Sequence, residues 1–191
     1  MRTFIAVNFP VETIHKITRV MDDLKSQTSA AAIKWVAPDA LHLTLKFIGE
    51  LPEEKVAEVT ALLTKTLQGL SPFEIEINRL GIYPNAKNPR VIWLGILGGE
   101  PLIKIHKILD RALAPLDIPS DRRHYAPHLT LARLRQRTDP EIARSIGKTV
   151  SQFEIDSLGV VVIDQIHLIR STLTPQGPLY SSLHNVPLDK V

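Results

Sequence analysis

A tetrapeptide occurs twice in this chain, and the duplication around it is the strongest constraint on the fold. His42-Leu43-Thr44-Leu45 recurs as His128-Leu129-Thr130-Leu131, 86 residues further along. Side chains alternate between the two faces of a strand, so each copy is expected to place its histidine and threonine on one face and its leucines in a core. If the fold brings the copies together, two imidazoles and two hydroxyls face one cavity.

Two further pairs of segments extend the repeat. They are Ile14–Ile17 with Ile105–Ile108, and Phe73–Glu76 with Phe153–Asp156. The matched segments keep their order, at offsets of 91, 86 and 80 residues. This pattern indicates an internal duplication. We expect repeats at about 1–80 and 90–162 within a single domain of two lobes that spans residues 1–191.

Hydrophobic periodicity predicts the order strand, helix, strand, helix, strand in each repeat. The expected elements besides the two tetrapeptide strands are 2–8, 11–24, 52–67 and 73–80, then 91–97, 101–113, 140–146 and 153–162. Asp139 is expected to cap the helix that begins at Pro140. Two more strands, 163–170 and 179–186, are expected around a turn at 174–177. Each half is expected to form an α+β lobe, with helices on one face of a mostly antiparallel sheet.

Composition limits the classes of function. The chain contains no cysteine, which excludes disulfides, a cysteine nucleophile and cysteine-ligated zinc. A net charge of +3 with a pI of about 9.2 is compatible with a polyanionic partner. The longest uncharged apolar stretch, Val91–Gly99, is far shorter than the roughly 20 residues that span a bilayer. We expect a soluble cytoplasmic protein that does not bind a membrane.

The paired histidines are the candidate catalytic residues. One imidazole can accept a proton while the other donates one, which suits the cleavage of a phosphoester without a metal. A lone histidine in a strand is more often structural, but both copies retain histidine and threonine while Lys46 and Ala132 differ. Zinc sites need at least three ligands, and neither tetrapeptide has a carboxylate nearby, so no metal is predicted. His42 and His128 are therefore expected to act together.

A basic segment surrounds the second tetrapeptide. Residues 122–137 include no aspartate or glutamate, and the arginines of this segment are Arg122, Arg123, Arg133, Arg135 and Arg137. Arg133 is the best candidate for a phosphate contact, because a guanidinium matches phosphate geometry. Strict alternation puts it opposite the face of His128, so a twist or bulge is required. Lys46 is expected to share the face of His42, and a solvated basic loop is the alternative for Arg122, Arg135 and Arg137.

Aromatic and further histidine side chains complete the candidates. The residues that could stack on bases, with core packing as the alternative for each, are Phe47, Trp35, Tyr83 and Tyr125. His15 and His106 lie on expected helices and are interpreted as structural or solvated. No role is assigned to His124, His167 or His184.

These segments resemble a known family. Trp35–Val36 with Leu41–Glu50, and Tyr125–Arg133, are similar to the two signatures of RNA 2′,3′-cyclic phosphodiesterases, also called 2′-5′ RNA ligases. Arg2–Val7 and Arg90–Gly95 resemble strands of the same family. The similarity covers nearly the whole chain. The family belongs to the two-histidine phosphoesterases, so the resemblance implies two pseudo-symmetric α+β lobes around a central active-site cleft.

The resemblance implies hydrolysis of a 2′,3′-cyclic phosphate at an RNA end to a 2′-phosphate. It carries over His42 as the proton donor to the leaving 3′ oxygen and His128 as the acceptor that activates water. The expected substrate-binding residues are Thr44, Thr130, Arg133, Phe47 and Tyr125. The reverse reaction would be ATP-independent 2′-5′ ligation. We expect a monomer that needs no cofactor and no metal.

Two alternatives remain open from the sequence. The first is an RNA-binding module without catalysis, which would show affinity for intact single strands and no turnover. The second is a related two-histidine phosphodiesterase that acts on small cyclic nucleotides or on 2′-5′ oligonucleotides. Turnover compared across these substrates separates the second alternative from an enzyme that acts on RNA ends.

Overall fold

The structure, a computed structural model, describes residues 1–121, 124–175 and 177–189. The strands are β1 (Arg2–Val7), β2 (Ile33–Trp35), β3 (Leu43–Glu50), β4 (Phe73–Tyr83), β5 (Val91–Leu97), β6 (His128–Leu134), β7 (Val160–Ile163), β8 (Gln165–Thr174) and β9 (Gly177–Pro187). The α-helices are α1 (Val11–Gln27), α2 (Val56–Leu67), α3 (Glu100–Leu113) and α4 (Pro140–Gln152). Short 3-10 helices cover Ala30–Ala32, Pro38–Ala40, Glu53–Lys55 and Ala114–Leu116.

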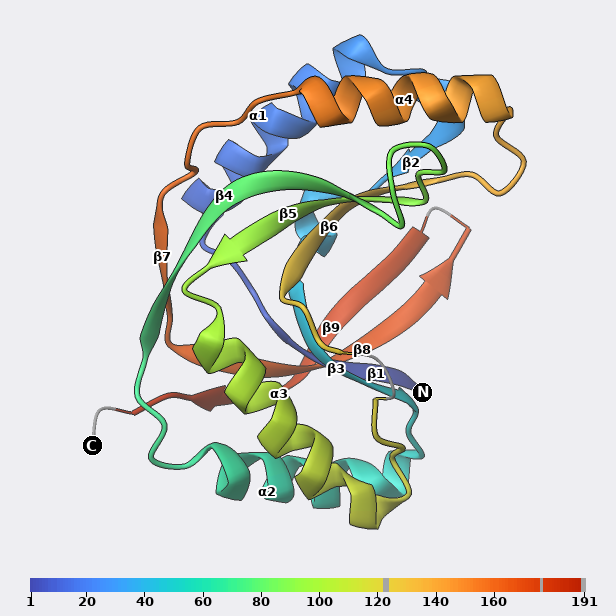
Figure 1. Ribbon diagram of the computed structural model, residues 1–191. Helices are drawn as coiled ribbons and strands as arrows, with labels where there is room; N and C mark the ends of the chain where they lie inside the picture. Colours follow the sequence, from blue (N-terminus) through green and yellow to red (C-terminus); the bar gives the residue numbers. More distant parts are fainter. Residues whose placement is uncertain (122–123, 176, 190–191) are drawn as a thin grey trace.

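In the described part of the chain, the strands form two sheets. The first sheet has the order β3-β1-β8-β9, and the second has the order β2-β6-β5-β4-β7. Neighbouring strands in both sheets run antiparallel. Helices cover the outer sides, with α1 and α4 beyond the second sheet and α2 and α3 beyond the first (Figure 1). The predicted α+β class with two antiparallel sheets and outer helices is confirmed.

We expected each sequence repeat to form its own sheet, but the two sheets do not coincide with the two repeats. β2 and β4 come from the first repeat but pair with β6, β5 and β7 in the second sheet. β8 and β9, which follow both repeats, complete the first sheet beside β1. The pairing of each strand is decided by long-range contacts that the pattern within one repeat does not contain.

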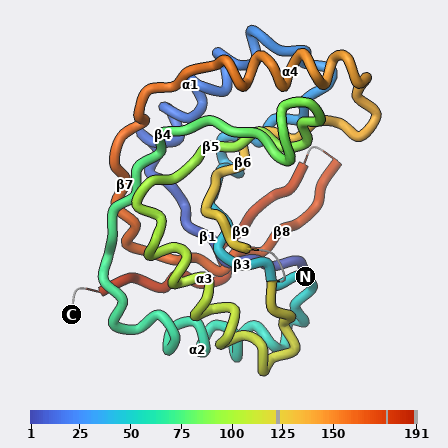
Figure 2. Tube along the Cα trace, in the orientation of Figure 1, coloured from blue at the N-terminus to red at the C-terminus, as the bar shows by residue number. Residues whose placement is uncertain are grey.

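The first helix of each repeat also crosses to the other sheet. α1 follows β1 of the first sheet, yet Lys25 of α1 lies 5.7 Å from the ring centroid of Trp35 on β2. α3 follows β5 of the second sheet and packs against β3 of the first. The backbone trace shows this path, with α1 beside α4 and α3 beside α2 (Figure 2). The repeats are therefore intertwined, which holds the sheets together without a linker.

The predicted core faces of the two histidine strands are confirmed. Leu43, Leu45, Leu129 and Leu131 are fully buried in one continuous hydrophobic core that receives residues from both sheets. None of the helices in the described residues is long and apolar enough to cross a membrane. The strands that carry the tetrapeptides are thus anchored through their leucines, which leaves the opposite faces available for function.

The second repeat differs from expectation at its end. The Asp139 side chain caps α4 by accepting hydrogen bonds from the backbone N–H groups of Glu141 and Ile142, as predicted, but the helix continues to Gln152. The strand predicted over 153–162 is wrong for its first part, since β7 begins only at Val160. The segment that corresponds to Phe153–Asp156 in the first repeat, Phe73–Glu76, does form a strand and pairs with β7. The segment before β7 therefore leads from α4 back to the sheet edge and joins β4 only at its end, where the Leu158 N–H donates to the Ile77 carbonyl oxygen at 2.8 Å.

Candidate active site

A β-bulge in β3 decides which side chains accompany the first histidine. Thr44 and Lys46 pair with consecutive residues of β1, so Leu45 between them is an extra residue in the ladder. A bulge shifts the following residues to the opposite face. Phe47 consequently shares the face of Thr44, whereas Lys46 turns into the interior and is 1% exposed. The expectation that Lys46 lines the cavity with His42 is wrong for this reason.

The same bulge occurs in β6. Thr130 and Ala132 pair with consecutive residues of β5, so Leu131 is the extra residue there. Arg133 consequently lies on the face of Thr130, and its side chain is exposed. The bulge required for Arg133 is therefore present, although it lies within the tetrapeptide rather than at the strand end.

We call the face of each sheet that carries the threonine the inner face, because the helices lie on the opposite face (Figure 1). Aromatic and titratable side chains on the inner faces include Phe4, His42, Phe47 and Tyr180 of the first sheet and Tyr83, Trp93, His128 and Arg133 of the second. Burial raises the pKa of the Tyr180 hydroxyl, and the charges of Arg133 and Arg2 oppose that shift. Arg133 belongs to the second sheet and Tyr180 to the first, so the two inner faces are near enough at this point for the charge of one to act on the other.

Both histidines are held in the same way. Nδ1 of His42 lies 2.8 Å from the carbonyl oxygen of Ala40, and Nδ1 of His128 lies 2.8 Å from the carbonyl oxygen of Ala126. A carbonyl oxygen only accepts, so each Nδ1 carries a proton and donates it. Each Nε2 is then an acceptor in the neutral ring and a donor in the charged ring. Two oriented groups of this kind can act as a base and an acid.

The surroundings of His42 favour its neutral form. Its ring centroid lies 4.7 Å from that of Phe4 and 5.1 Å from that of Tyr180, which stands edge-on at 90°. Burial lowers the pKa of His42, although the hydrogen bond to Ala40 opposes the shift. In the free protein His42 is therefore neutral near pH 7.

His128 has a corresponding pair of aromatic neighbours. Its ring centroid lies 5.5 Å from that of Tyr83 and 6.3 Å from that of Trp93. Tyr83 stacks on Trp93 at 5.1 Å and is 38% exposed. The indole of Trp93 lies over Gly81 on β4, where a Cβ would overlap the ring. Glycine at this position thus leaves room for the indole beside His128.

A buried polar network holds the back of β3. Lys46 Nζ lies 2.6 Å from Asp110 Oδ1 on α3, 2.8 Å from the Pro119 carbonyl oxygen and 3.2 Å from Asp121 Oδ2. An ammonium has three donors, and these three acceptors match them. The network ties the residue after the β3 bulge to α3 and to the segment that follows it.

Two more hydrogen bonds fix the bulge itself. His106 Nδ1 on α3 donates to the Leu45 carbonyl oxygen at 2.8 Å, and the Tyr125 hydroxyl donates to the Thr44 carbonyl oxygen at 2.9 Å. The rings of His106 and Tyr125 are stacked with centroids 4.2 Å apart. Burial raises the pKa of Tyr125, so its hydroxyl keeps the proton that it donates. His106 is structural, as interpreted from the sequence, and the geometry gives Tyr125 a positioning role.

One group of residues has the chemistry of metal ligands. His106, Asp110 and Asp121 bring ligand atoms within 4.8 Å of one another. The Lys46 ammonium already bonds both carboxylates, and His106 Nδ1 is used as a donor to Leu45. The carboxylates of this cluster are therefore already paired with the Lys46 ammonium. The cluster lies behind β3 rather than on the inner face.

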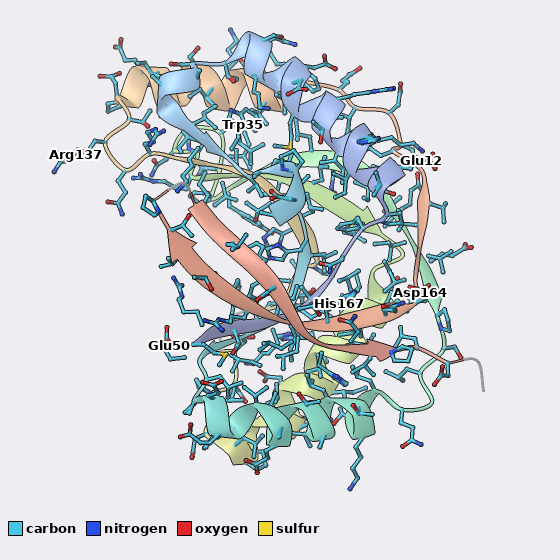
Figure 3. All side chains as sticks on the ribbon, turned by 180° about the vertical axis from the view of Figure 1, so that it is seen from behind. Glu12, Trp35, Glu50, Arg137, Asp164 and His167 are labelled. Carbon is cyan, nitrogen blue, oxygen red and sulfur yellow. The ribbon has the colours of Figure 1, made fainter. Side chains whose placement is uncertain are left out.

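The other sequence candidates are distributed differently. Phe47 is 64% exposed on the inner face, whereas Trp35 packs toward α1 and the core. Arg135 and Arg137 are exposed beyond β6, and Arg137 projects from the edge of the molecule (Figure 3). Arg122 and Arg123 lie outside the described residues. The remaining histidines His15 and His124 are exposed, while His167 bonds Asn185 and His184 bonds Thr64.

Three aromatic inner-face residues were not identified from the sequence. Phe4 and Trp93 lie on the strands that pair with the tetrapeptides, so knowledge of that pairing is the signal that could have found them. Tyr180 lies on β9, outside both repeats, and has no sequence signal that links it to His42.

The chain is similar to known proteins along nearly its whole length. Residues 10–170 match the model of the 2′-5′ RNA ligase superfamily. Two proteins named RNA 2′,3′-cyclic phosphodiesterase, from Methanothermobacter thermautotrophicus and Archaeoglobus fulgidus, are 32% and 31% identical to this chain. Each alignment covers 96% of this chain, and 96% and 98% of the respective relatives. A crystal structure of a Thermus thermophilus protein matches with a TM-score of 0.82 at 26% identity, over 100% of this chain and 99% of that one. The fold is also that of Escherichia coli LigT in its apo form, with a TM-score of 0.75 at 23% identity over 99% and 98% of the two chains.

Proposed function

The chain belongs to the 2′-5′ RNA ligase superfamily, and we propose that it hydrolyses the 2′,3′-cyclic phosphate at an RNA end to a 2′-phosphate. The observation that carries the proposal is the matched pair of histidines, each with Nδ1 bonded to a carbonyl and Nε2 available for proton transfer. Relatives with the name RNA 2′,3′-cyclic phosphodiesterase support the choice of substrate.

The proposed reaction moves two protons in opposite directions. Water attacks the phosphorus atom while His128 Nε2 accepts its proton. The bond between phosphorus and the 3′ oxygen breaks, and His42 Nε2 gives a proton to that oxygen. The product is a 2′-phosphate with a free 3′-hydroxyl, and one proton has passed from His42 to His128. Each proton transfer is expected to contribute roughly 10²–10⁴-fold to the rate.

Because His42 is buried, it needs the bound substrate to hold the proton that it donates. Its lowered pKa means that the free protein holds it neutral near pH 7. A cyclic phosphate anion beside Nε2 favours the charged imidazolium, because an opposite charge within a few ångströms raises the pKa of a histidine. In this proposal His42 gains its proton with the substrate, so the reactive protonation state forms in the complex.

The remaining inner-face residues bind the substrate in this proposal. The hydroxyls of Thr44 and Thr130 donate to the phosphoryl oxygens, where charge develops in the transition state. Arg133 supplies a guanidinium to the same oxygens, and exposed Phe47 offers a face for a base. Tyr125 contributes indirectly, by holding the backbone at Thr44.

The same groups can open the ring with a second nucleophile. A 5′-hydroxyl in the place of water attacks the phosphorus atom and loses its proton to His128. The bond between phosphorus and the 3′ oxygen breaks, His42 gives a proton to that oxygen, and the product is a 2′-5′ phosphodiester. The strain of the cyclic phosphate supplies the energy, so this ligation would need no ATP.

Product analysis tests the proposed function. An RNA with a 2′,3′-cyclic phosphate end should give a 2′-phosphate, with activity retained in the presence of EDTA. His42→Ala and His128→Ala should each reduce kcat by roughly 10²–10⁴-fold. A 3′-phosphate product, or activity lost with EDTA and restored by zinc or magnesium, contradicts the mechanism. Turnover of small cyclic nucleotides or 2′-5′ oligonucleotides in preference to RNA ends would redirect the substrate assignment.

A substrate with sulfur in place of the 3′ oxygen separates the roles of the histidines. A thiolate leaves without a proton donor, so His42→Ala should recover much of its rate on this substrate. His128→Ala should stay slow, because water still needs a base. Recovery of His128→Ala alone would reverse the assignment of acid and base.

A further inference from the structure

Arg79 lies on the inner face of the second sheet, in line with His128. Across the strands β6, β5 and β4, His128 pairs with Gly95 and Gly95 pairs with Arg79. Residues that pair directly across antiparallel strands share a face. A bulge in β4, where Asn78 is the extra residue, moves Arg79 away from the buried face of Ile77. Without the bulge, strict alternation would place Arg79 on the buried face of Ile77, so the sequence pattern does not predict Arg79 on the inner face.

Gly95 leaves room above β5 for the Arg79 side chain and the Trp93 ring. A Cβ at Gly95 would lie 3.2 Å from the Arg79 Cβ and 3.3 Å from its Nε. The Arg79 side chain therefore lies close to the surface above Gly95, on the path from β4 toward His128. Its guanidinium carbon is 6.0 Å from the ring centroid of Trp93, which is also a neighbour of His128.

The charge of Arg79 is available to a ligand. Arg79 is exposed, and within residues 1–121, 124–175 and 177–189 no carboxylate lies within 4.0 Å of its guanidinium. The nearest acidic residue along the same face of β4 is Glu76, two register positions away. An arginine guanidinium close to an aromatic ring is typical of surfaces that bind phosphates and stacked bases together.

We propose that Arg79 binds the internucleotide phosphate next to the terminal nucleotide, on its 5′ side. This inference rests on the proposed function, which places the cyclic phosphate at the histidines. Neighbouring strands lie about 4.8 Å apart, so the guanidinium above Gly95 is roughly one strand spacing from His128. From this position an exposed arginine side chain can reach a phosphate that adjoins the one at the histidines. Arg79 would thereby distinguish an RNA end from a free cyclic mononucleotide.

Two substrates and two variants test this role. The substrates are adenosine 2′,3′-cyclic phosphate and the dinucleotide ApA with a 2′,3′-cyclic phosphate end. Arg79→Gln should lower kcat/KM for the dinucleotide about tenfold through KM, as expected for one charge-assisted hydrogen bond. Turnover of the mononucleotide should stay within about twofold of the wild-type value, because its only phosphate lies at the histidines. Arg144→Gln, an exposed arginine on α4, is the matched control and should leave both substrates unchanged.

A neutral methylphosphonate linkage in the dinucleotide gives an independent readout. With this linkage the wild type and Arg79→Gln should have equal kcat/KM, since the partner charge is gone. Equal losses on mononucleotide and dinucleotide, or no loss on either, overturn the inference and leave the proposed function intact. Wild-type protein that turns over neither substrate refutes the proposed function and this inference together.

Discussion

Replacing Asp110 by alanine removes the main partner of a buried charge. The Lys46 side chain is completely buried, and Asp110, at 2.6 Å from its Nζ, is 18% exposed. In Asp110→Ala the ammonium keeps only the Pro119 carbonyl oxygen at 2.8 Å and the more exposed carboxylate of Asp121 at 3.2 Å. We therefore expect a large loss of stability from one truncated side chain on the surface of α3.

The magnitude follows from the burial of the pair. Loss of one partner of a buried ion pair typically costs about 3–5 kcal/mol, and the remaining Asp121 contact places this case near 3 kcal/mol. For a domain of this size that free energy corresponds to a decrease in Tm of about 6–12 °C. Lys46→Met removes the buried charge itself and should cost only about 1 kcal/mol. The double variant should resemble Lys46→Met rather than add both losses.

Urea unfolding and thermal melting, followed by circular dichroism, measure these differences. Asp22→Ala is the matched control, because Asp22 forms an ion pair of 2.7 Å with Lys25 at the surface of α1. It should cost about 0.5 kcal/mol or less. The reasoning is refuted if Asp110→Ala unfolds within about 0.5 kcal/mol of the wild type, or if the double variant shows the sum of the two single losses.

The pH dependence of the same variant gives a second check. Burial acts to raise the pKa of Asp110, but the Lys46 ammonium, together with hydrogen bonds from Asp121 and Ser120, outweighs it, and the pKa is lowered. A lowered carboxyl pKa stabilises the fold above the pKa of the unfolded chain, and the effect is lost as pH falls through the folded value. The difference in Tm between wild type and Asp110→Ala should thus shrink below about pH 4. A difference that is unchanged down to about pH 2 would contradict this origin.

Three further predictions concern the helix cap and the aromatic surroundings of the histidines. Asp139→Ala removes the α4 cap and should cost about 1 kcal/mol in urea unfolding, and an unchanged midpoint would show that the cap is dispensable. Gly81→Ala forces a Cβ into the indole of Trp93 and should lower the free energy of unfolding by about 1–3 kcal/mol. A shift of the indole N–H signal in NMR spectra would show the displacement directly, whereas an unshifted signal with unchanged stability would contradict the close contact. Tyr180→Ala exposes His42 and should raise the pKa of this histidine toward about 6.5 in an NMR titration, whereas a pKa that stays at the wild-type value would exclude burial by Tyr180 as a cause.

Local signals in the sequence predicted much of the framework. The helix over 101–113 and the strand over 91–97 correspond closely to α3 and β5, because their apolar residues recur at the period of the element that they form. The cap at Asp139 was predictable because capping involves only neighbouring residues. The strand expected over Phe153–Asp156 was wrong, since apolar alternation does not reveal whether a partner edge is available.

Which side chains lie on the inner faces depends on the pairing between distant strands. Alternation alone put Lys46 beside His42 and excluded Arg133 from the face of His128. The bulges at Leu45 and Leu131 reverse both assignments, and the bulge at Asn78 does the same for Arg79. A bulge is a property of two paired strands, so it is absent from the periodicity of one strand.

By itself, the sequence determined that two equivalent segments each carry a histidine and a threonine, with leucines that are buried. Covalent order and side-chain alternation are sufficient for that. Only the tertiary structure decided which charges stay on the inner faces, with Lys46 buried against Asp110 and Arg133 exposed, and which aromatic ring, Tyr180, covers His42. These outcomes depend on the intertwined sheets and helices, whose contacts join segments that no local pattern relates.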